Sequence, residues 1–308
     1  MLAKTPRRIL LLGARGQVGW ELERALSTLG EVVAVARHGT AHTLDLARLE
    51  DIAPLVEAVR PRWIVNAAAW TAVDQAERDE AAALLINAEA VARLAEAARR
   101  TEALLVHYST DYVFDGQAGE PYAEGGAPRP INAYGRSKWL GEQAIHAAGV
   151  PHLILRTGWV YGLRGHNFMR TIRRLARERE VLRVVMDQHG SPTWSRHLAC
   201  ATAQILAQLG DDRQAWQALG GTYHLASSGA TTWYGFACAI VAHQRRHEPI
   251  LAERVEPIVT AELDLPAPRP AYSVLRTDKA FASFGVRLPH WREALRQVQD
   301  ELDQERMV

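Results

Sequence analysis

The 308-residue chain has few cysteines, no long apolar run and no excess charge of either sign. Its two cysteines, Cys200 and Cys238, are too far apart to form a CxxC pair, which argues against a disulfide framework or a thiolate metal site and fits a reducing cytosol. No apolar run reaches the ~18 residues that a membrane-spanning helix needs. The basic segment 1–8 leads into only four apolar residues, which is too short for a signal peptide.

Charge and aromatic content argue against nucleic-acid and membrane partners. The chain has 36 Lys and Arg against 35 Asp and Glu, so its formal net charge of +1 gives no overall attraction for nucleic acid or anionic lipid. The nine tryptophans are scattered and form no stacking platform for single-stranded nucleic acid. We therefore expect a cytoplasmic globular protein whose recognition of anions is local.

Short apolar runs alternate with longer helical patterns in the first half of the chain. The runs are 9–12, 32–35, 63–65, 104–106 and 153–155, each typical of a strand buried on both faces of a parallel sheet. Helical patterns cover 17–29, 49–59 and 79–100. This alternation predicts an α/β fold with a doubly wound parallel sheet of the Rossmann type.

After about residue 156 the alternation is less regular. The pattern predicts helices over 168–180, 198–209, 233–247 and about 291–304, a strand over 181–186 and a Pro-rich loop over 265–270. No linker rich in Gly or Ser separates the halves. We expect a dinucleotide-binding domain over 1–156 and a smaller, mainly substrate-binding α/β region over 157–308, with some segments returning to the first domain.

A glycine-rich loop follows the first predicted strand and opens the first predicted helix. Its residues are Gly13, Ala14, Arg15, Gly16, Gln17, Val18 and Gly19. In a dinucleotide site, Gly13 permits the tight turn, Gly16 lets the backbone approach a pyrophosphate, and Gly19 lets the helix pack on the sheet. The helix N-terminus supplies N–H groups for the phosphates. The alternative is a tight turn that binds no ligand.

The end of the second predicted strand indicates the choice of cofactor. It reads Ala36-Arg37-His38, without the carboxylate that would bind a ribose 2′-hydroxyl, and Arg15 adds a second cation nearby. This favours NADPH over NADH, with NADH still possible. The alternative is that Arg37 is only a solvated residue. Asp45-Leu46 lies where the end of a third strand could hold adenine.

Tyr134 and Lys138 are four residues apart on a predicted helix and therefore share one face. An ammonium group beside a phenol lowers the pKa of the phenol, so Tyr134 could donate a proton to a carbonyl oxygen as hydride reaches the carbon. Thr110 ends a predicted strand, where its hydroxyl could stabilise charge on the same oxygen. The alternative for the Tyr-Lys pair is an exposed helix face.

Several motifs together resemble the extended short-chain dehydrogenase/reductases, and more narrowly those reductases that act on a dTDP-linked 4-keto-6-deoxyhexose. The motifs are GARGQVGWE (13–21), NAAAWTAVDQAE (66–77), HYSTDYVF (107–114), YGRSK (134–138), RTGWVYG (156–162), DQHGSPT (187–193) and Arg269-Pro270. The resemblance covers nearly the whole chain. It implies reduction of a C4 keto group with a nicotinamide cofactor.

The resemblance also implies roles for individual residues. Thr110, Tyr134 and Lys138 match catalytic positions, Asp111 and Trp159 match contacts to the sugar nucleotide, and Gly16, Gln17, Val18, Asp45, Leu46, Ala69, Trp70 and Thr71 match cofactor contacts. For Trp159 the alternative is core packing. Arg269 is a candidate for the substrate diphosphate.

Three alternatives or open points accompany this interpretation. The chain could be a reductase or epimerase of another nucleotide sugar, although epimerases of this group usually hold NAD, which the basic end of the second strand disfavours. It could also be a regulatory subunit that binds NADP without turnover. A homodimer is common among such proteins, but no heptad or apolar patch in the sequence indicates one.

We predict no metal site. Some similar proteins bind Mg²⁺ through glutamates near a dimer interface; here Glu21 is retained, but Arg196 stands at the position we align with another ligand and would repel a cation. His243 and His247 have the spacing of a zinc pair, yet the intervening residues favour a solvated helix face. Arg173, Arg174, Arg177 and Arg179 likewise suggest a charged helix face, from which one or two arginines could reach nucleotide phosphates.

Overall fold

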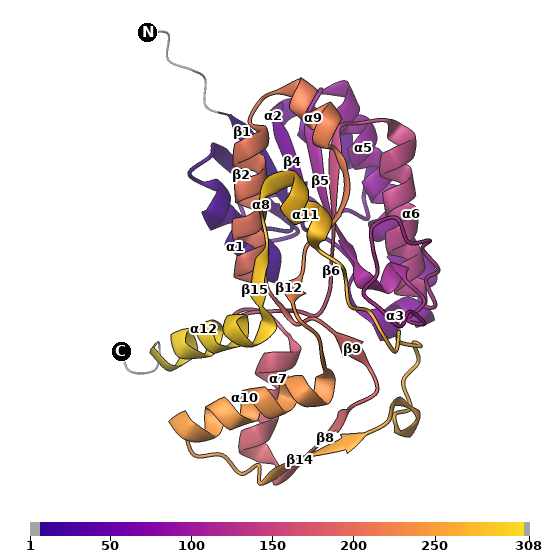
Figure 1. Ribbon diagram of the computed structural model, residues 1–308. Helices are drawn as coiled ribbons and strands as arrows, with labels where there is room; N and C mark the ends of the chain where they lie inside the picture. The colour runs from indigo at the N-terminus through magenta and orange to yellow at the C-terminus, as the bar shows by residue number, and fades with distance from the viewer. Residues whose placement is uncertain (1–6, 305–308) are drawn as a thin grey trace.

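The computed structural model describes residues 7–304. Most of the basic segment considered for a signal peptide, residues 1–6, therefore lies outside the described residues. Figure 1 shows a large sheet flanked by helices and, below it, a smaller part that contains α7, α10, β8 and β14.

A seven-stranded parallel sheet forms the centre of the larger part, in the order β11-β6-β5-β4-β1-β2-β3. Its strands are β1 (Arg8–Leu12), β2 (Glu31–Ala36), β3 (His42–Thr43), β4 (Trp63–Asn66), β5 (Leu104–Thr110), β6 (His152–Thr157) and β11 (Gly221–His224). Strand order reverses after β1, with β2 and β3 on one side and β4, β5 and β6 on the other, which confirms the predicted doubly wound α/β fold.

Both faces of the sheet are covered because successive side chains of each strand point to opposite faces. In β1, Ile9 and Leu11 pack on one face with α1 (Gln17–Leu26), α8 (Ser195–Leu209) and α11 (Asp278–Phe284). Leu10 and Leu12 pack on the other face with α2 (Ile52–Val59), α5 (Ala90–Arg100) and α6 (Ala133–Ala148). The continuous apolar run in the sequence thus contributes to two separate cores.

Two predictions about individual elements were wrong. Strand β2 is not buried on both faces, because beyond it lies only the two-residue strand β3 and Val35 alone is fully buried. The helical pattern over 79–100 is not one α-helix: α4 (Glu80–Leu84) and α5 are joined by the π-helical turn η2 (Leu85–Glu89). Inserted π turns are frequent at functional sites.

The π turn carries the buried side chain of Asn87, which holds the loop after β4 in place. Asn87 accepts a hydrogen bond from the Trp70 backbone N–H at 2.9 Å and donates to the Trp70 carbonyl at 3.0 Å. It also donates to the Ser137 hydroxyl on α6 at 2.9 Å. The loop after β4 is thereby tied to α6, the helix that carries Tyr134.

The smaller part has a hydrophobic core of its own. It consists mainly of α7 (Phe168–Glu178), β8 (Val181–Val185), α10 (Trp233–His247), β14 (Arg254–Ile258) and α12 (Trp291–Gln304), with Phe236 and Trp291 among its buried residues. Strands β8 and β14 pair in parallel. Between these segments the chain returns to the sheet as α8, β11 and α11.

Shorter elements connect these parts. They are η1 (Leu49–Asp51), α3 (Val73–Arg78), η3 (Asp111–Val113), β7 (Val160–Tyr161), β9 (His189–Gly190), β10 (Thr193–Trp194), α9 (Arg213–Leu219), β12 (Ser227–Ser228), β13 (Thr231–Thr232), η4 (Thr260–Glu262) and β15 (Leu288–His290). Within residues 7–304, no helix combines the length and the apolar character that crossing a membrane requires.

Candidate active site

A cavity of about 690 Å³ opens at the carboxyl ends of the sheet strands. Every residue that the sequence suggested for cofactor binding lines it, except Gly19: Gly13, Arg15, Gly16, Gln17, Val18, Arg37, Asp45, Leu46, Ala69, Trp70, Thr71, Tyr134 and Lys138. The carboxyl ends of parallel strands at a change of strand order are where such folds bind ligands.

The glycine loop has the close contacts that its three glycines suggest. A Cβ atom on Gly19 would lie 2.0 Å from the Gly13 carbonyl oxygen, so the first turn of α1 can approach the loop only without a side chain there. Gly13 has φ +79°, and a Cβ on it would lie 2.7 Å from the Ala68 nitrogen. Gly19 therefore shapes the loop from behind the cavity wall.

The N-terminus of α1 suits an anion. Its N-cap is Gly16, which offers no capping side chain, and its first turn has no acidic residue. The N–H groups of a first helical turn have no partner within the helix and carry a partial positive charge. Gly16, Gln17 and Val18 line the cavity, so these groups are available to a phosphate.

Basic side chains gather at the end of β2. Arg15, Arg37 and His38 line the same end of the cavity, and the Arg15 guanidinium lies 3.5 Å from where a Cβ on Gly39 would be. Asp45, on the same wall, accepts a hydrogen bond from the Ala47 backbone N–H at 3.1 Å. Two exposed guanidinium groups favour a phosphate over a bare hydroxyl at this end.

Tyr134 lies in the first turn of α6, which Asn132 caps by accepting a hydrogen bond from the Gly135 N–H at 2.7 Å. The Thr110 hydroxyl lowers the pKa of Tyr134, but burial dominates and raises this pKa to about 12. This direction is opposite to the one predicted from the Tyr-Lys spacing. The reason is that burial dominates, while the Lys138 amine is hydrogen-bonded to other groups.

Lys138 is almost completely buried beneath the cavity. Its Nζ donates to the Tyr108 carbonyl oxygen at 2.7 Å and lies 3.0 Å from Nε2 of His107. Burial lowers the pKa of Lys138 to about 8, partly opposed by the Glu142 carboxylate. Burial, with the neighbouring ammonium, also holds the pKa of His107 well below its usual range, so this imidazole is neutral.

The hydrogen bonds around His107 determine which of its nitrogens carries the proton. The Ala68 N–H donates to Oδ1 of Asn66 at 3.1 Å, so the Asn66 amide nitrogen faces Nδ1 of His107, also at 3.1 Å. An amide nitrogen only donates, which makes Nδ1 the acceptor and places the proton on Nε2. That N–H points at Lys138, and the pairing is best when Lys138 is an uncharged amine. Asn66 and His107 thus oppose the charge on Lys138.

Asp111, a predicted substrate contact, is buried beside the catalytic candidates. Burial raises the pKa of Asp111 to about 6, opposed by the Ser273 hydroxyl and by the hydrogen bond from the Thr110 hydroxyl. A Cβ on Gly158 would lie 2.5 Å from the Asp111 carboxylate, so that position accommodates only glycine without rearrangement.

None of the four predicted substrate residues, Thr110, Asp111, Trp159 and Arg269, is among the residues that line this cavity. Trp159 has φ +51°, stacks on Trp233 with ring centroids 3.5 Å apart, and fills the space left by Gly190. Arg269 forms an ion pair with Asp74 at 2.8 Å. The Arg269 side chain therefore lies against Asp74 of α3 and not in the cavity.

Sequence reasoning missed a buried polar group behind the site. Glu142 is one helical turn after Lys138 and pairs with Arg156 at 2.6 Å, while Ser109 donates a hydrogen bond to the same carboxylate. The spacing of Lys138 and Glu142 was a signal in the sequence. Asn66 and His107 end or interrupt apolar runs, and only the three-dimensional fold links them to Lys138.

Two predictions of solvated helix faces were wrong in part. His243 is only 6% exposed because α12 packs over α10, and it hydrogen-bonds to Asp303. Arg173 is only 4% exposed and forms ion pairs with Glu248 and Asp303. In each case a helix distant in sequence covers the charged face.

Arg196, the residue expected to repel Mg²⁺, pairs with two carboxylates. Its Nε lies 3.2 Å from Glu21 of α1, and another of its nitrogens contacts Glu301 of α12. The guanidinium group thus lies between the two acidic side chains and links three helices.

Comparison with known proteins gives a consistent result over nearly the entire chain. Residues 7–304 match the family described as RmlD substrate binding domain. The chain is 50% identical to a dTDP-4-dehydrorhamnose reductase of Burkholderia thailandensis over 94% of the chain and 96% of that protein. Identity to the Escherichia coli K12 enzyme of the same name is 42%, over 96% of the chain and 97% of that protein.

A solved structure agrees. The dTDP-4-dehydrorhamnose reductase of Bacillus anthracis in complex with NADP is 34% identical, with a TM-score of 0.85, over 96% of this chain and 99% of that one. The glycine loop, the Tyr-Lys pair on α6 and the strand-end threonine therefore occur in a chain that belongs to the RmlD family, the family of the dTDP-4-dehydrorhamnose reductases.

Proposed function

We propose that the protein reduces the C4 keto group of dTDP-4-dehydro-L-rhamnose with NADPH, giving dTDP-L-rhamnose. The observation that carries the proposal is that Tyr134 and Lys138 line the same cavity as the glycine loop. The names of the full-length relatives support the substrate, and the NADP in the Bacillus anthracis structure supports the cofactor.

The cavity supplies a partner for each part of the cofactor. The first-turn N–H groups of α1 would bind the pyrophosphate, Arg15 and Arg37 the 2′-phosphate, and Asp45 with Leu46 the adenosine half. Ala69, Trp70, Thr71 and Lys138 would hold the nicotinamide half. When bound, NADPH supplies the hydride that reduces C4.

The proton comes from the protein. Tyr134 would donate its hydroxyl proton to the C4 oxygen, and Thr110 would donate a hydrogen bond to the same oxygen, stabilising the negative charge that develops there. When protonated, Lys138 would stabilise the phenolate left on Tyr134. Thr110 and Lys138 are buried and Tyr134 is half-buried, which limits the screening of these interactions by water.

Substrate would be held on the side of the smaller part of the molecule. Asp111 would hydrogen-bond the sugar, Trp159 would present the ring edge that its stack on Trp233 leaves accessible, and Arg269 would meet the diphosphate after exchanging its partner Asp74. The roles of Asp111 and Trp159 rest on matched positions in similar reductases, and the role of Arg269 rests on its positive charge.

The test is NADPH oxidation followed at 340 nm, with the keto-sugar nucleotide generated in situ. Wild type should consume NADPH, and Tyr134→Phe should lose at least about 100-fold in kcat, since general-acid catalysis contributes that much. Tyr122→Phe is the matched control, because Tyr122 bonds Asp115 and lies outside the cavity lining. NADPH bound but never consumed would identify a regulatory subunit, and consumption only with another sugar would identify a different nucleotide-sugar enzyme.

We also propose a cytoplasmic location, a homodimer and a functional division at about residue 156. The second hydrophobic core supports a separate substrate-binding region over 157–308. Three elements of this half, α8, β11 and α11, pack instead with the sheet of the cofactor domain. Light scattering of the purified chain tests the dimer, and a mass of one chain would contradict it.

A further inference from the structure

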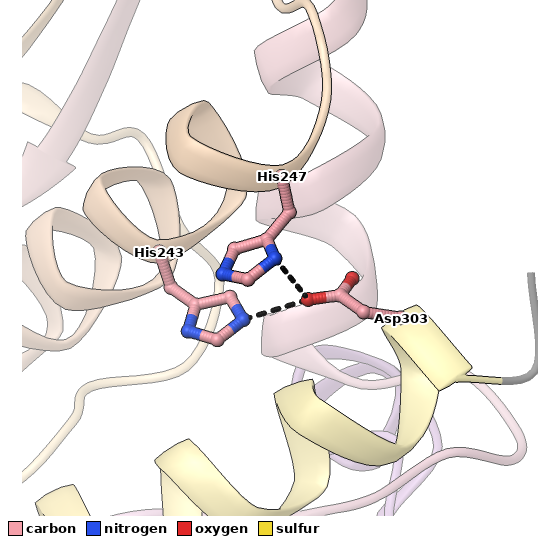
Figure 2. A group of neighbouring side chains, drawn as sticks. All are labelled: His243, His247 and Asp303. Carbon is pink, nitrogen blue, oxygen red and sulfur yellow. Dashed lines mark hydrogen bonds and ion pairs between the residues drawn. The ribbon is translucent and has the colours of Figure 1, made fainter. Parts of the chain in front are cut away.

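Two histidines and an aspartate from two helices meet in the smaller part of the molecule (Figure 2). Nε2 of His243 lies 2.8 Å from Oδ2 of Asp303, and Nδ1 of His247 lies 3.4 Å from the same oxygen. We propose that His243, His247 and Asp303 form a binding site for a divalent transition-metal ion, with Zn²⁺ as the best-fitting ion.

The two histidines are arranged as a pair of ligands on one helix. They are four residues apart on α10, so they lie on the same face, and their rings stack with centroids 4.4 Å apart and planes 13° apart. Both rings present a nitrogen toward α12, as Figure 2 shows. The ligand atoms of all three side chains lie within 4.8 Å of one another.

The type and number of ligands fit zinc. Two imidazole nitrogens and one carboxylate oxygen are a common protein ligand set for Zn²⁺, with water in the fourth position. A tetrahedral ion with ligands at about 2.0–2.2 Å separates neighbouring ligand atoms by about 3.4 Å. The His247–Asp303 pair already has that spacing. The His243–Asp303 pair must open by about half an ångström, and Asp303 lies in the last turn of α12, next to its end at Gln304.

The contacts around Asp303 leave one of its two carboxylate oxygens facing the histidines. Arg173 approaches Oδ1 of Asp303 at 3.6 Å and Glu248 at 3.2 Å, so the guanidinium orients the carboxylate while Oδ2 faces the imidazoles. Arg245, between the histidines in sequence, donates instead to the carbonyls of Ala252 and Glu253. The His247 side chain is 45% exposed, which gives an ion access from solvent.

Cobalt is a direct probe of this site, because four-coordinate Co²⁺ with nitrogen and oxygen ligands absorbs visible light far more strongly than the hydrated ion. Full-length protein, freed of metal by chelation, should develop this absorption with one equivalent of Co²⁺, and Zn²⁺ should abolish it. Zn²⁺ should also raise the melting temperature, since the ion would join α10 to α12.

Variants distinguish this site from general binding by the twelve histidines of the chain. Even partners outside the ligand shell change metal affinity by about 10- to 100-fold, so His247→Ala and Asp303→Asn should each weaken Co²⁺ binding at least ~10-fold. His42→Ala removes an exposed histidine outside the cluster and should bind as wild type does. Octahedral-type weak absorption in wild type, or equal affinity in all variants, would overturn the proposal.

Discussion

The hydrogen bonds of Lys138 give a residue-scale prediction about pH. Asn66→Asp keeps an oxygen for the Ala68 N–H and presents a second oxygen to Nδ1 of His107. The proton of His107 should then move to Nδ1, so that Nε2 accepts a hydrogen bond from the Lys138 ammonium. The pKa of Lys138, about 8 in the wild-type protein, should therefore rise.

The corresponding measurement is the pH profile of kcat/KM. If Lys138 acts as an ammonium, wild-type activity falls as pH rises through about 8, and in Asn66→Asp this alkaline limb should move up by about 1 unit. A structural role for Asn66 would lower activity equally at all pH values. An unmoved alkaline limb would contradict the tautomer assigned to His107.

The raised pKa of Asp111 gives a second prediction at the scale of single residues. Its pKa is raised from 3.8 to about 6, so the folded protein binds the proton more tightly than the unfolded chain does. The wild-type free energy of unfolding should therefore decrease as pH rises from about 4 to 6. The isosteric Asp111→Asn cannot ionise, so its stability relative to wild type should increase by about 1.4 kcal/mol between pH 5 and pH 7.5. Urea unfolding at both pH values measures this, and an equal difference at both would refute it.

Individual site residues were predictable where the chemistry lies in a short stretch of sequence. The spacing of Gly13 to Gly19 predicts the phosphate loop, and the spacing of Tyr134 and Lys138 predicts the catalytic pair. Most of these residues line the cavity. The pKa of Tyr134 was not predictable, because its direction depends on burial and on hydrogen bonds that Lys138 makes to β5. Long-range contacts of this kind leave no local pattern.

At the scale of elements, α6 and the π turn give a stability prediction. Gly141 faces η2, and a Cβ there would lie 2.1 Å from the Asn87 carbonyl oxygen. On an exposed helix, alanine in place of glycine would stabilise by about 1 kcal/mol. Here Gly141→Ala should instead destabilise by about 2 kcal/mol, since the two backbones must separate.

Thermal or urea unfolding of Gly141→Ala tests this contact. Ala147→Gly, at an exposed position of the same helix, is the control and should cost no more than about 1 kcal/mol. Gly141→Ala as stable as wild type would mean that η2 moves freely away from α6.

Elements were predicted well where one period dominates the sequence. The helices Trp233–His247 and Trp291–Gln304 have the bounds that the pattern suggested. The π turn at 85–89 was not predictable, because its residues are ordinary helix formers and its extra width arises from packing against α6. The burial of His243 and Arg173 was missed for the same reason, since a distant helix provides the cover.

For the molecule as a whole, the ion pairs of Arg196 lead us to expect that catalytic activity does not depend on Mg²⁺. Its guanidinium lies between Glu21 and Glu301, so the cation that these carboxylates would attract is already supplied by the protein. NADPH oxidation should proceed at the same rate with EDTA and with added MgCl₂. A rate that falls severalfold in EDTA and recovers with Mg²⁺ would contradict this prediction, whereas Zn²⁺ at His243 would affect melting temperature only.

The first turn of α1 has a consequence for the ligand-free state of the protein. Helices α6, α7 and α10 begin with a side chain that accepts a hydrogen bond from their first turn, contributed by Asn132, Asn167 and Thr232. Helix α1 begins with Gly16 and has no such side chain. A bound pyrophosphate would accept hydrogen bonds from the N–H groups of the first turn, and so would replace the capping side chain that α1 lacks. Each release of cofactor then returns the N–H groups at the start of α1 to water, so cofactor binding and the stability of this helix end are linked.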